Sequence, residues 1–295
     1  MNSFFSYRPA DLRRIPVRPA ESNKGTFGRV LVIGGSPCMS GAAYFSAKAA
    51  YRMGAGLVQI LTHCENRIIL QTQLPEAILT TYDDPEAVGE TIKEAIAKAD
   101  VIVIGVGLGR SEQAKILLRM TFRNAEVPLI VDADALNILS ENEEIWSLAS
   151  APLIITPHPL EMSRLCRLDL QILLRDRLQV AVDFAEKYAL ICVLKGHETI
   201  VTDGTEARGA GDENYIYLNH SGNSGMATGG SGDVLTGVIA GLIAQKVPLF
   251  EAASLGVYIH GLAGDAAAER LGEYSVMASD IIESIPEIIK DCHEE

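Results

Sequence analysis

The chain has 295 residues, of which 48% are hydrophobic and 21% are charged, and 38 acidic residues outnumber 25 basic ones to give a formal net charge of −13. This length and composition exclude a mini-protein, a disordered chain and a fibrous repeat. The acidic balance argues against a nucleic-acid partner, because no block of basic residues offsets it.

Residues 1–23 are expected to form an amino-terminal arm. Its four arginines, Arg8, Arg13, Arg14 and Arg18, lie near prolines, and we interpret them as solvated rather than as a binding patch. No apolar stretch has the form of a signal peptide or the length of a membrane span, so no membrane partner is expected. Five scattered cysteines without a C-x-x-C pair argue against disulfides or zinc and fit a reducing cytoplasm.

From Arg29 onward, short aliphatic runs alternate with helical patterns, which predicts an α/β fold with a parallel sheet. Strands are expected at residues 29–34, 57–62, 101–105, 128–133, 153–156 and 191–195. Helices are expected at residues 41–53, 85–98, 111–122, 175–188, 233–245, 250–271 and 278–292. Residues 198–219 predict two or three short antiparallel strands. Since no repeat or linker divides the chain, we expect a single domain over residues 1–295.

The strongest local signal is the glycine-rich stretch at residues 219–241, which follows a predicted strand and runs into a predicted helix. Glycines there let backbone N–H groups approach an anion, and the helix directs its positive end to the same place. Asp233 at this helix start fits a base that deprotonates an incoming hydroxyl. The alternative is a plain helix cap with close glycine packing, and we favour the catalytic interpretation.

Other glycine-rich junctions are ambiguous by themselves. The dipeptide Gly-Lys is absent, which excludes a Walker A loop, and the glycines at residues 105–109 lack the spacing of a dinucleotide fingerprint. They could admit a ligand at a strand end or form a tight turn. The small residues within 34–43 could permit close contact by a ligand or by another helix. Lys195 closes a strand and could contact a nucleotide or extend into water.

His158 lies between two prolines after a predicted strand, and Glu161 follows it by three residues. This carboxylate could serve a hydrated magnesium ion or occupy the first turn of a helix. The histidines form no H-x-x-x-H pattern, which argues against a tight transition-metal site.

Taken together and in this order, the motifs resemble those of the ADP- or ATP-dependent NAD(P)H-hydrate dehydratases, a branch of the ribokinase-like superfamily. The resemblance runs from KGTFGRVLVIGG at Lys24 through GVGLG, VDADALNIL, TPHPLEM and VLKGHETIV to GNSGMATGGSGDVLTGVIAGLIAQ. It implies a ribokinase-like three-layer αβα sandwich with a mostly parallel central sheet. The family's bifunctional arrangement adds an epimerase domain, and we expect only the dehydratase domain here.

The resemblance implies a substrate, NADH or NADPH hydrated across a ring double bond, and a phosphoryl donor, ADP or ATP, used with Mg²⁺. The residues that would contact the hydrated cofactor are Ala43, Gly107, His158 and Asp233. Those that would line the nucleotide site are Lys195, Gly196, His197, Glu198, Thr199 and Gly232. The N–H groups of Gly230, Ser231 and Gly232 would form an anion hole, and Glu161 would hold Mg²⁺ through water.

The expected reaction is that of a hydro-lyase. Asp233 would accept the ring hydroxyl proton while the oxygen attacks the terminal phosphoryl group, and the resulting phosphate ester is a better leaving group than hydroxide. A small-alcohol kinase of the same fold is the alternative, but His158 stands where such kinases more often carry Asn. A third hypothesis is a non-catalytic nucleotide sensor. The intact GGSGD motif argues against it, because a sensor would tolerate the loss of this aspartate.

The long carboxyl-terminal helices carry apolar residues that could serve the core or a subunit interface: Leu255, Val257, Ile259 and Leu262. The family resemblance implies a homo-oligomer, with a homotetramer as one candidate.

Overall fold

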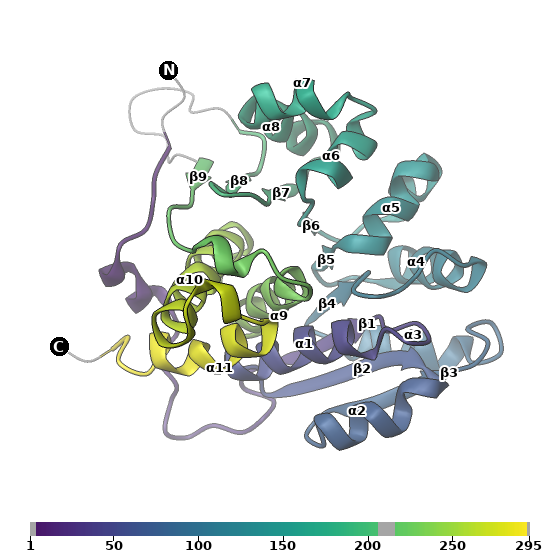
Figure 1. Cartoon of the computed structure of the whole chain (residues 1–295). Coiled ribbons are helices and arrows are strands. Elements are labelled where there is room, and N and C mark those ends of the chain that lie inside the picture. The colour runs from purple at the N-terminus through teal and green to yellow at the C-terminus, as the bar shows by residue number, and fades with distance from the viewer. Residues whose placement is uncertain (1–3, 206–215, 294–295) are drawn as a thin grey trace.

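A sheet with the strand order β3-β2-β1-β4-β5-β6-β7-β8-β9 runs through the computed structural model, which describes residues 4–205 and 216–293 (Figure 1). Strands β1 to β7 pair in parallel, and β8 and β9 add an antiparallel edge. The strands are β1 (Arg29–Ile33), β2 (Leu57–His63), β3 (Ile78–Tyr82), β4 (Val101–Ile104), β5 (Leu129–Val131), β6 (Leu153–Ile155), β7 (Ile191–Leu194), β8 (Ile200–Thr202) and β9 (Ile216–Leu218).

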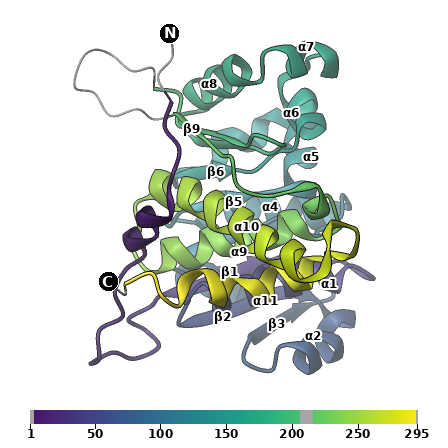
Figure 2. The ribbon, with the colours of Figure 1, turned by 60° about the vertical axis from the view of Figure 1, so that its left-hand side comes forward.

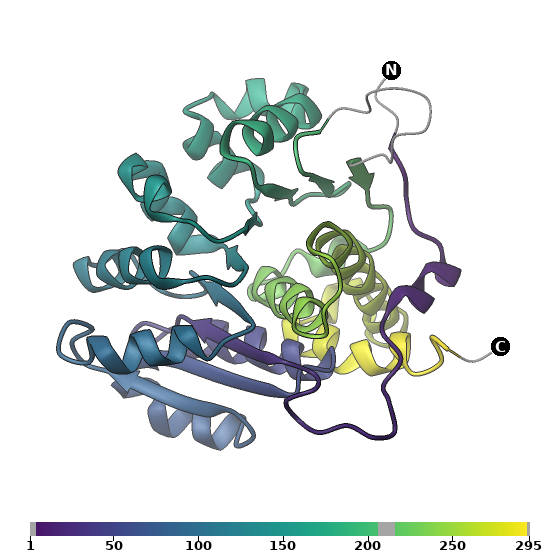
Figure 3. The same cartoon turned by 180° about the vertical axis from the view of Figure 1, so that it is seen from behind.

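Helices cover both faces of the sheet, as Figure 3 shows from behind. Helices α1 (Ser40–Arg52), α2 (Arg67–Gln73), α9 (Ser231–Ala244), α10 (Leu249–Leu271) and α11 (Ala278–Ile289) contribute to one apolar core. Helices α3 (Gly89–Ala97), α4 (Glu112–Asn124), α5 (Ala133–Glu141), α6 (Pro159–Cys166), α7 (Leu170–Arg175) and α8 (Arg177–Tyr188) contribute to the other. The 3-10 helices are Pro9–Arg14, Cys64–Asn66, Glu143–Leu148, Ser224–Met226 and Glu273–Ser275.

Alternation along the strands divides the side chains between the two cores. Val30 and Val32 of β1 lie in the first core, whereas Leu31 and Ile33 lie in the second, and all four are fully buried. Neighbouring side chains point to opposite faces of a sheet, so a strand covered on both sides must be apolar at every position. The predicted parallel α/β architecture is therefore confirmed.

The predicted strands and helices exist, with shifted ends. Helix α3 begins at Gly89 instead of residue 85, because residues 85–88 form turns, and α9 begins at Ser231, two residues before Asp233. Strand β3 and helices α2, α5, α6 and α7 were not predicted. Strands β8 and β9 confirm two antiparallel strands, and residues 206–215 of the predicted stretch lie outside the described residues.

The amino-terminal arm packs against the fold through its aromatic residues, while its four arginines, interpreted from the sequence as solvated, are exposed. Phe5 forms a β-bridge with Tyr217, and the Tyr7 hydroxyl lies 3.0 Å from Ser254 Oγ. Arg14 forms an ion pair with Glu251 at 2.9 Å. The reason is that the arm's aromatic rings bury apolar surface against β9 and α10, beside which this segment runs (Figure 2).

The sequence did not decide whether the apolar residues of α10 serve the core or a subunit interface, and the structure places them in the core. Leu255, Val257 and Ile259 are buried, and Leu262 is partly buried against the same core. Among the described residues, no helix combines the length and the apolar character needed to cross a membrane.

Helices α1 and α9 pack closely because α9 carries glycines at their contact. A Cβ added to Gly237 would lie 2.1 Å from the carbonyl oxygen of Ser46, and one added to Gly241 would lie 2.6 Å from Met53 Cβ. Both distances are too short for a side chain, so these glycines set the spacing of the two helices.

Gly237→Ala should therefore lower the free energy of unfolding by about 1–3 kcal/mol, the usual cost of overpacking, despite the better helix propensity of alanine. Urea denaturation measures the change. Gly89→Ala is the matched control, because a Cβ there would meet only Met120 Cε, at 3.6 Å. Equal stability of the two variants would contradict the prediction.

Candidate active site

The carboxyl ends of five adjacent parallel strands carry most of the predicted site residues. Strands β1, β4, β5, β6 and β7 are neighbours in this order. The segments that follow them contain, respectively, Gly35, Gly107, Asp132, His158 and Lys195. The chain order reverses between β1 and β4, and open α/β sheets bind their ligands in the crevice at such a point.

The two glycine-rich junctions that were ambiguous by sequence lie against each other at this reversal. The Gly35 N–H donates to the Val106 carbonyl at 3.0 Å, and the Ser36 N–H donates to the Gly107 carbonyl at 2.6 Å. Gly107 has φ +56°, and a Cβ there would lie 2.8 Å from Ala42 Cβ. Glycine is thus required for this close approach.

Of the adjacent alanines in α1, Ala43 is fully buried, whereas Ala42 is partly exposed. The side-chain surface facing Gly107 therefore belongs to Ala42, and the predicted contact of Ala43 with a substrate stays a prediction.

His158 caps helix α6 and is held in one tautomer. Its Nδ1 accepts the N–H groups of Leu160 and Glu161, both at 3.2 Å, so the ring proton lies on Nε2, 3.3 Å from Glu161 Oε1. The Glu161 carboxylate also accepts the His158 N–H at 2.8 Å. Burial, followed by the positive charge of Lys195, lowers the pKa of His158, which keeps its imidazole neutral.

A buried ion pair joins β5 to β7. Lys195 Nζ donates to Asp132 Oδ1 at 2.7 Å, and the Asp132 side chain is almost fully buried. Burial works to lower the pKa of Lys195, but the charges of Asp132, Glu161 and Asp233 and the hydrogen bond to Asp132 together outweigh it, and the net pKa shift is upward. A Cβ added to Gly232 would lie 3.2 Å from Lys195 Nζ and 3.6 Å from Asp132 Oδ2, so the start of α9 touches this pair.

Asp233 lies in the first turn of α9, half-buried and near the same charges. Burial and, to a smaller extent, the charge of Asp132 raise its pKa to about 7, although Lys195 offsets part of the rise. In the part of the chain that the structure describes, the Asp233 carboxylate has no hydrogen-bond partner. A carboxylate with a pKa near neutral and a free oxygen is suited to accept a proton from a ligand.

Glu161 is a third carboxylate near Lys195. Its side chain is almost completely buried, and burial raises its pKa, although Lys195 acts in the opposite direction. The structure thus brings His158, Glu161, Lys195, Gly232 and Asp233 to one place, and their roles stay predictions that the family resemblance implies.

The predicted anion hole lies at the start of α9, where Gly230 adopts φ +92° as the residue before the helix. The Ser231 N–H already donates to the Thr228 carbonyl at 3.3 Å. Within the described residues, no acceptor is found for the N–H groups of Gly230 and Gly232. These two N–H groups, with the positive end of the helix, make the better anion donors.

The segment that follows β7 forms a tight loop at residues 195–199. Gly196, His197 and Glu198 are exposed, whereas Thr199 is buried and its Oγ1 donates to the Gly196 carbonyl at 3.1 Å. The His197 and Glu198 side chains lie at exposed positions of this loop, and their predicted nucleotide contacts stay predictions.

Two residues of this region were missed by sequence analysis. Arg177, the first residue of α8, donates through Nη2 to the carbonyls of Leu194, Lys195 and Glu198 and so holds the loop after β7. No motif marks it, because its partners are backbone atoms distant in sequence. Asp132 could have been found, since it is the acidic residue that ends a predicted strand at the ligand-binding edge.

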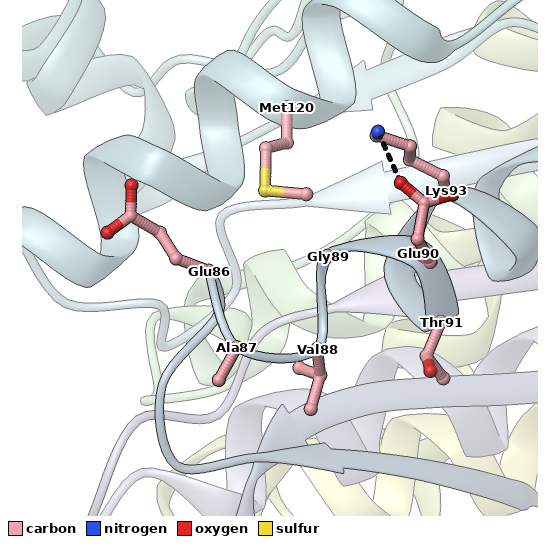
Figure 4. A pocket seen from close by; sticks show the side chains of 8 residues that line it. All are labelled: Glu86, Ala87, Val88, Gly89, Glu90, Thr91, Lys93 and Met120. Atoms are coloured by element: carbon pink, nitrogen blue, oxygen red, sulfur yellow. Dashed lines mark hydrogen bonds and ion pairs between the residues drawn. The ribbon is translucent and has the colours of Figure 1, made fainter.

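Two other features lie apart from this cluster. A hollow of about 410 Å³ lies between the start of α3 and helix α4, and it is bordered by residues 86–91, Lys93 and Met120 (Figure 4). Its only drawn interaction is the Lys93–Glu90 ion pair at 2.7 Å. None of the site residues predicted from the sequence lines this hollow, and we give it no catalytic interpretation.

The second feature is a cluster at the ends of β2 and β3, where donor atoms of His63, Cys64 and Asp83 lie within 4.8 Å of one another. The Cys64 thiol donates to Asp83 Oδ1 at 3.2 Å, and this hydrogen bond raises the pKa of the thiol. Sequence spacing did not reveal the cluster, because Asp83 comes from a different strand. The side chains satisfy one another here by hydrogen bonding.

The sequence matches a family model and several curated relatives. Residues 30–287 match a family model described as NAD(P)H-hydrate dehydratase. A bifunctional NAD(P)H-hydrate repair enzyme of Moorella thermoacetica is 37% identical over 96% of this chain and 53% of its own length. An ADP-dependent (S)-NAD(P)H-hydrate dehydratase of Neisseria meningitidis is 39% identical over 86% of this chain and 82% of its own length. The chain spans about half the length of the first curated relatives that it matches.

Similar solved structures agree with the match to the family model. A ribokinase-like superfamily protein of Enterococcus faecalis is 31% identical, with a TM-score of 0.85 and full coverage of both chains. An ADP/ATP-dependent NAD(P)H-hydrate dehydratase of Bacillus subtilis, co-crystallised with ATP and Mg²⁺, is 27% identical, with a TM-score of 0.82 over 99% of each chain. These likenesses confirm the expected ribokinase-like fold.

The raised pKa of Asp233 has a consequence for stability. Because this pKa is about 7 in the folded protein and ordinarily 3.8, the bound proton stabilises the fold below about pH 4, and the stabilisation is lost as pH rises through 7. Asp233→Asn keeps the shape without the charge. Its free energy of unfolding, relative to wild type, should therefore increase between about pH 5 and about pH 8.

Chemical denaturation of both proteins at a series of pH values measures this difference. A difference that stays constant over the range would show that Asp233 ionises no less easily in the folded protein than in the unfolded chain.

Proposed function

The chain belongs to the NAD(P)H-hydrate dehydratase family, and we propose that it uses ADP or ATP to dehydrate hydrated NADH or NADPH to NADH or NADPH. The observation that carries the proposal is Asp233, a carboxylate with a pKa of about 7 at the start of α9, beside free N–H groups and the Lys195–Asp132 pair. This arrangement offers a base, anion donors and a cation at one place. Phosphorylation of a hydroxyl requires these three groups.

The proposed ligand contacts follow the arrangement of strand ends. The hydrated cofactor would lie over the β1–β4 reversal, near Ala43, Gly107 and His158, with its ring hydroxyl at Asp233. His158 would offer the exposed part of its ring, since its Nδ1 accepts two N–H groups and its Nε2 lies against Glu161 Oε1. The phosphoryl donor would be held by these residues after β7 and at α9: Lys195, Gly196, His197, Glu198, Thr199 and Gly232.

Asp233 is proposed to start the reaction by accepting the proton of the ring hydroxyl. The hydroxyl oxygen attacks the terminal phosphoryl group of ADP or ATP, while the N–H groups at residues 230–232 hold the developing charge. The ring nitrogen's lone pair then expels inorganic phosphate, and loss of a proton from the neighbouring ring carbon restores the dihydronicotinamide. The nucleotide leaves with one phosphate fewer.

The donor set also suits Mg²⁺, which prefers oxygen ligands and usually keeps several waters. Three carboxylates, Asp132, Glu161 and Asp233, act on the single ammonium of Lys195, so negative charge is in excess here. Glu161 would hold the ion through water. When bound, the ion would neutralise charge on the phosphates of the donor.

We further propose one dehydratase domain over residues 1–295 that acts in the cytoplasm as a homo-oligomer, with a homotetramer as one candidate. The five cysteines are free, which fits a reducing compartment. Exposed apolar side chains on α2 and the edge strand β3 support self-association: Ile68, Ile69 and Ile78.

Incubation of the protein with hydrated NADH or NADPH, Mg²⁺ and either ADP or ATP tests the activity. The return of dihydronicotinamide absorbance should be matched by an equal amount of inorganic phosphate. No return with either nucleotide, together with a phosphorylated product from another alcohol, would instead identify a kinase.

Asp233→Asn should reduce turnover by about two orders of magnitude or more while leaving nucleotide affinity nearly unchanged, because it removes the base and keeps the shape. Steady-state kinetics and calorimetric titration of ADP measure the two effects. Asp280→Asn is the matched control, since Asp280 occupies the same helical position in α11, where its side chain accepts the Met277 N–H at 2.9 Å. Near-normal turnover of Asp233→Asn would remove Asp233 from the base role.

A further inference from the structure

The segment at residues 219–230, here called the cradle segment, leads directly into the anion donors of α9 and lies along helix α10. Asp265 of α10 makes two hydrogen bonds to it. The Gly222 N–H donates to Asp265 Oδ2 and the Asn223 Nδ2 donates to Asp265 Oδ1, both at 2.9 Å. One carboxylate therefore binds both the backbone and a side chain of the cradle segment.

The surface of α10 is shaped for this contact. A Cβ added to Gly261 would lie 2.1 Å from Ser221 Oγ, and one added to Gly264 would lie 2.2 Å from Met226 Sδ. Ser221 Oγ also lies 3.0 Å from the Tyr258 carbonyl oxygen. The cradle segment thus rests on a groove of α10 that only glycines leave open, and Asp265 anchors it at one end of that groove.

A second contact joins α10 to the first residue of α9. His260 is buried, and its Nε2 lies 3.4 Å from the hydroxyl of Ser231, the first residue of α9. Burial lowers the pKa of His260 to about 4, so its ring is neutral and adds no charge beneath the donors. Helix α10 therefore touches the cradle segment at its beginning and α9 at its first turn.

The hydrogen bonds of Asn223 are directional. Its Oδ1 accepts the Gly225 N–H at 3.0 Å, while its Nδ2 is directed to Asp265. An ionised carboxylate only accepts hydrogen bonds, whereas an amide must present one accepting and one donating end. If an amide replaces the Asp265 carboxylate, a donor faces a donor. If a carboxylate replaces the Asn223 amide, an acceptor faces an acceptor.

We propose that Asp265 is a positioning residue for phosphoryl transfer: through Gly222 and Asn223 it holds the cradle segment so that the N–H groups of residues 230–232 and Asp233 face the phosphates of the donor. The inference deepens the proposed function and rests on it for its catalytic part. Its binding part requires only that ADP or ATP occupies the start of α9.

The test exchanges the two side chains. Asp265→Asn places an amide against an amide, and Asn223→Asp places a carboxylate against a carboxylate. Each single variant should weaken binding of ADP with Mg²⁺ by about tenfold or more, the usual effect of losing a hydrogen bond to a charged group. In the double variant N223D/D265N every donor again faces an acceptor, because the new amide at residue 265 can accept the Gly222 N–H and donate to the new carboxylate at residue 223. Its affinity should return to within about threefold of wild type.

Calorimetric titration of ADP with Mg²⁺, expressed per folded protein, is the principal readout, and KM for the nucleotide and kcat are measured alongside. Glu269→Gln is the matched control, since Glu269 is an exposed carboxylate four residues further along α10. The Glu269→Gln variant should bind ADP with the same affinity as wild type. Melting temperatures identify any variant that fails to fold. Should Asp265→Asn be such a variant, Asn223→Ala, which removes the Nδ2 donor and leaves α10 intact, should show the same weakening.

Single variants that bind ADP as wild type does, or a double variant as weak as the single ones, would overturn the inference. A wild-type protein that binds ADP but does not dehydrate hydrated NADH or NADPH would instead contradict the proposed function, and the binding comparison would still decide the role of Asp265. The two failures are therefore distinguishable.

Discussion

An excess of buried negative charge around one ammonium group organises the site. Lys195 pairs with Asp132 at 2.7 Å, and the carboxylates of Glu161 and Asp233 act on the same cation. Burial is the largest cause that raises the pKa values of Glu161 and Asp233, the charge of Asp132 also raises them, and Lys195 offsets only part of the rise. The same imbalance that keeps Asp233 ready to take a proton makes the site receptive to a divalent cation.

The sheet makes this convergence possible. Parallel strands end on one edge, and β5, β6 and β7 are adjacent, so the residues that follow them meet although they are separated by many residues in the chain. Helix α9 comes from the carboxyl-terminal third and contributes its first turn to the same edge. Glycines at residues 34, 107, 230 and 232 leave room for close neighbours, since a Cβ at each would meet a backbone or side-chain atom at 3.2 Å or less.

Sequence patterns predicted the central strands well, because strands buried on both faces are continuous apolar runs. They failed for the edge strand β3, whose residues Thr80 and Thr81 break such a run, and for the short helices α2, α5, α6 and α7. They also placed the start of α9 at Asp233, although Gly230 already ends the preceding loop in a left-handed conformation. Short elements contain too few periodic positions for a pattern to identify them.

The order of residues was enough to specify a parallel α/β sheet, a glycine-rich anion loop and Asp233 as a candidate base, because each depends on local composition and spacing. Folding in three dimensions was needed to bring Asp132 to Lys195, Arg177 to the loop after β7 and Asp265 beneath the cradle segment. These contacts join residues that are distant in the chain, and strand order and helix packing, which no local pattern encodes, determine which distant residues become neighbours.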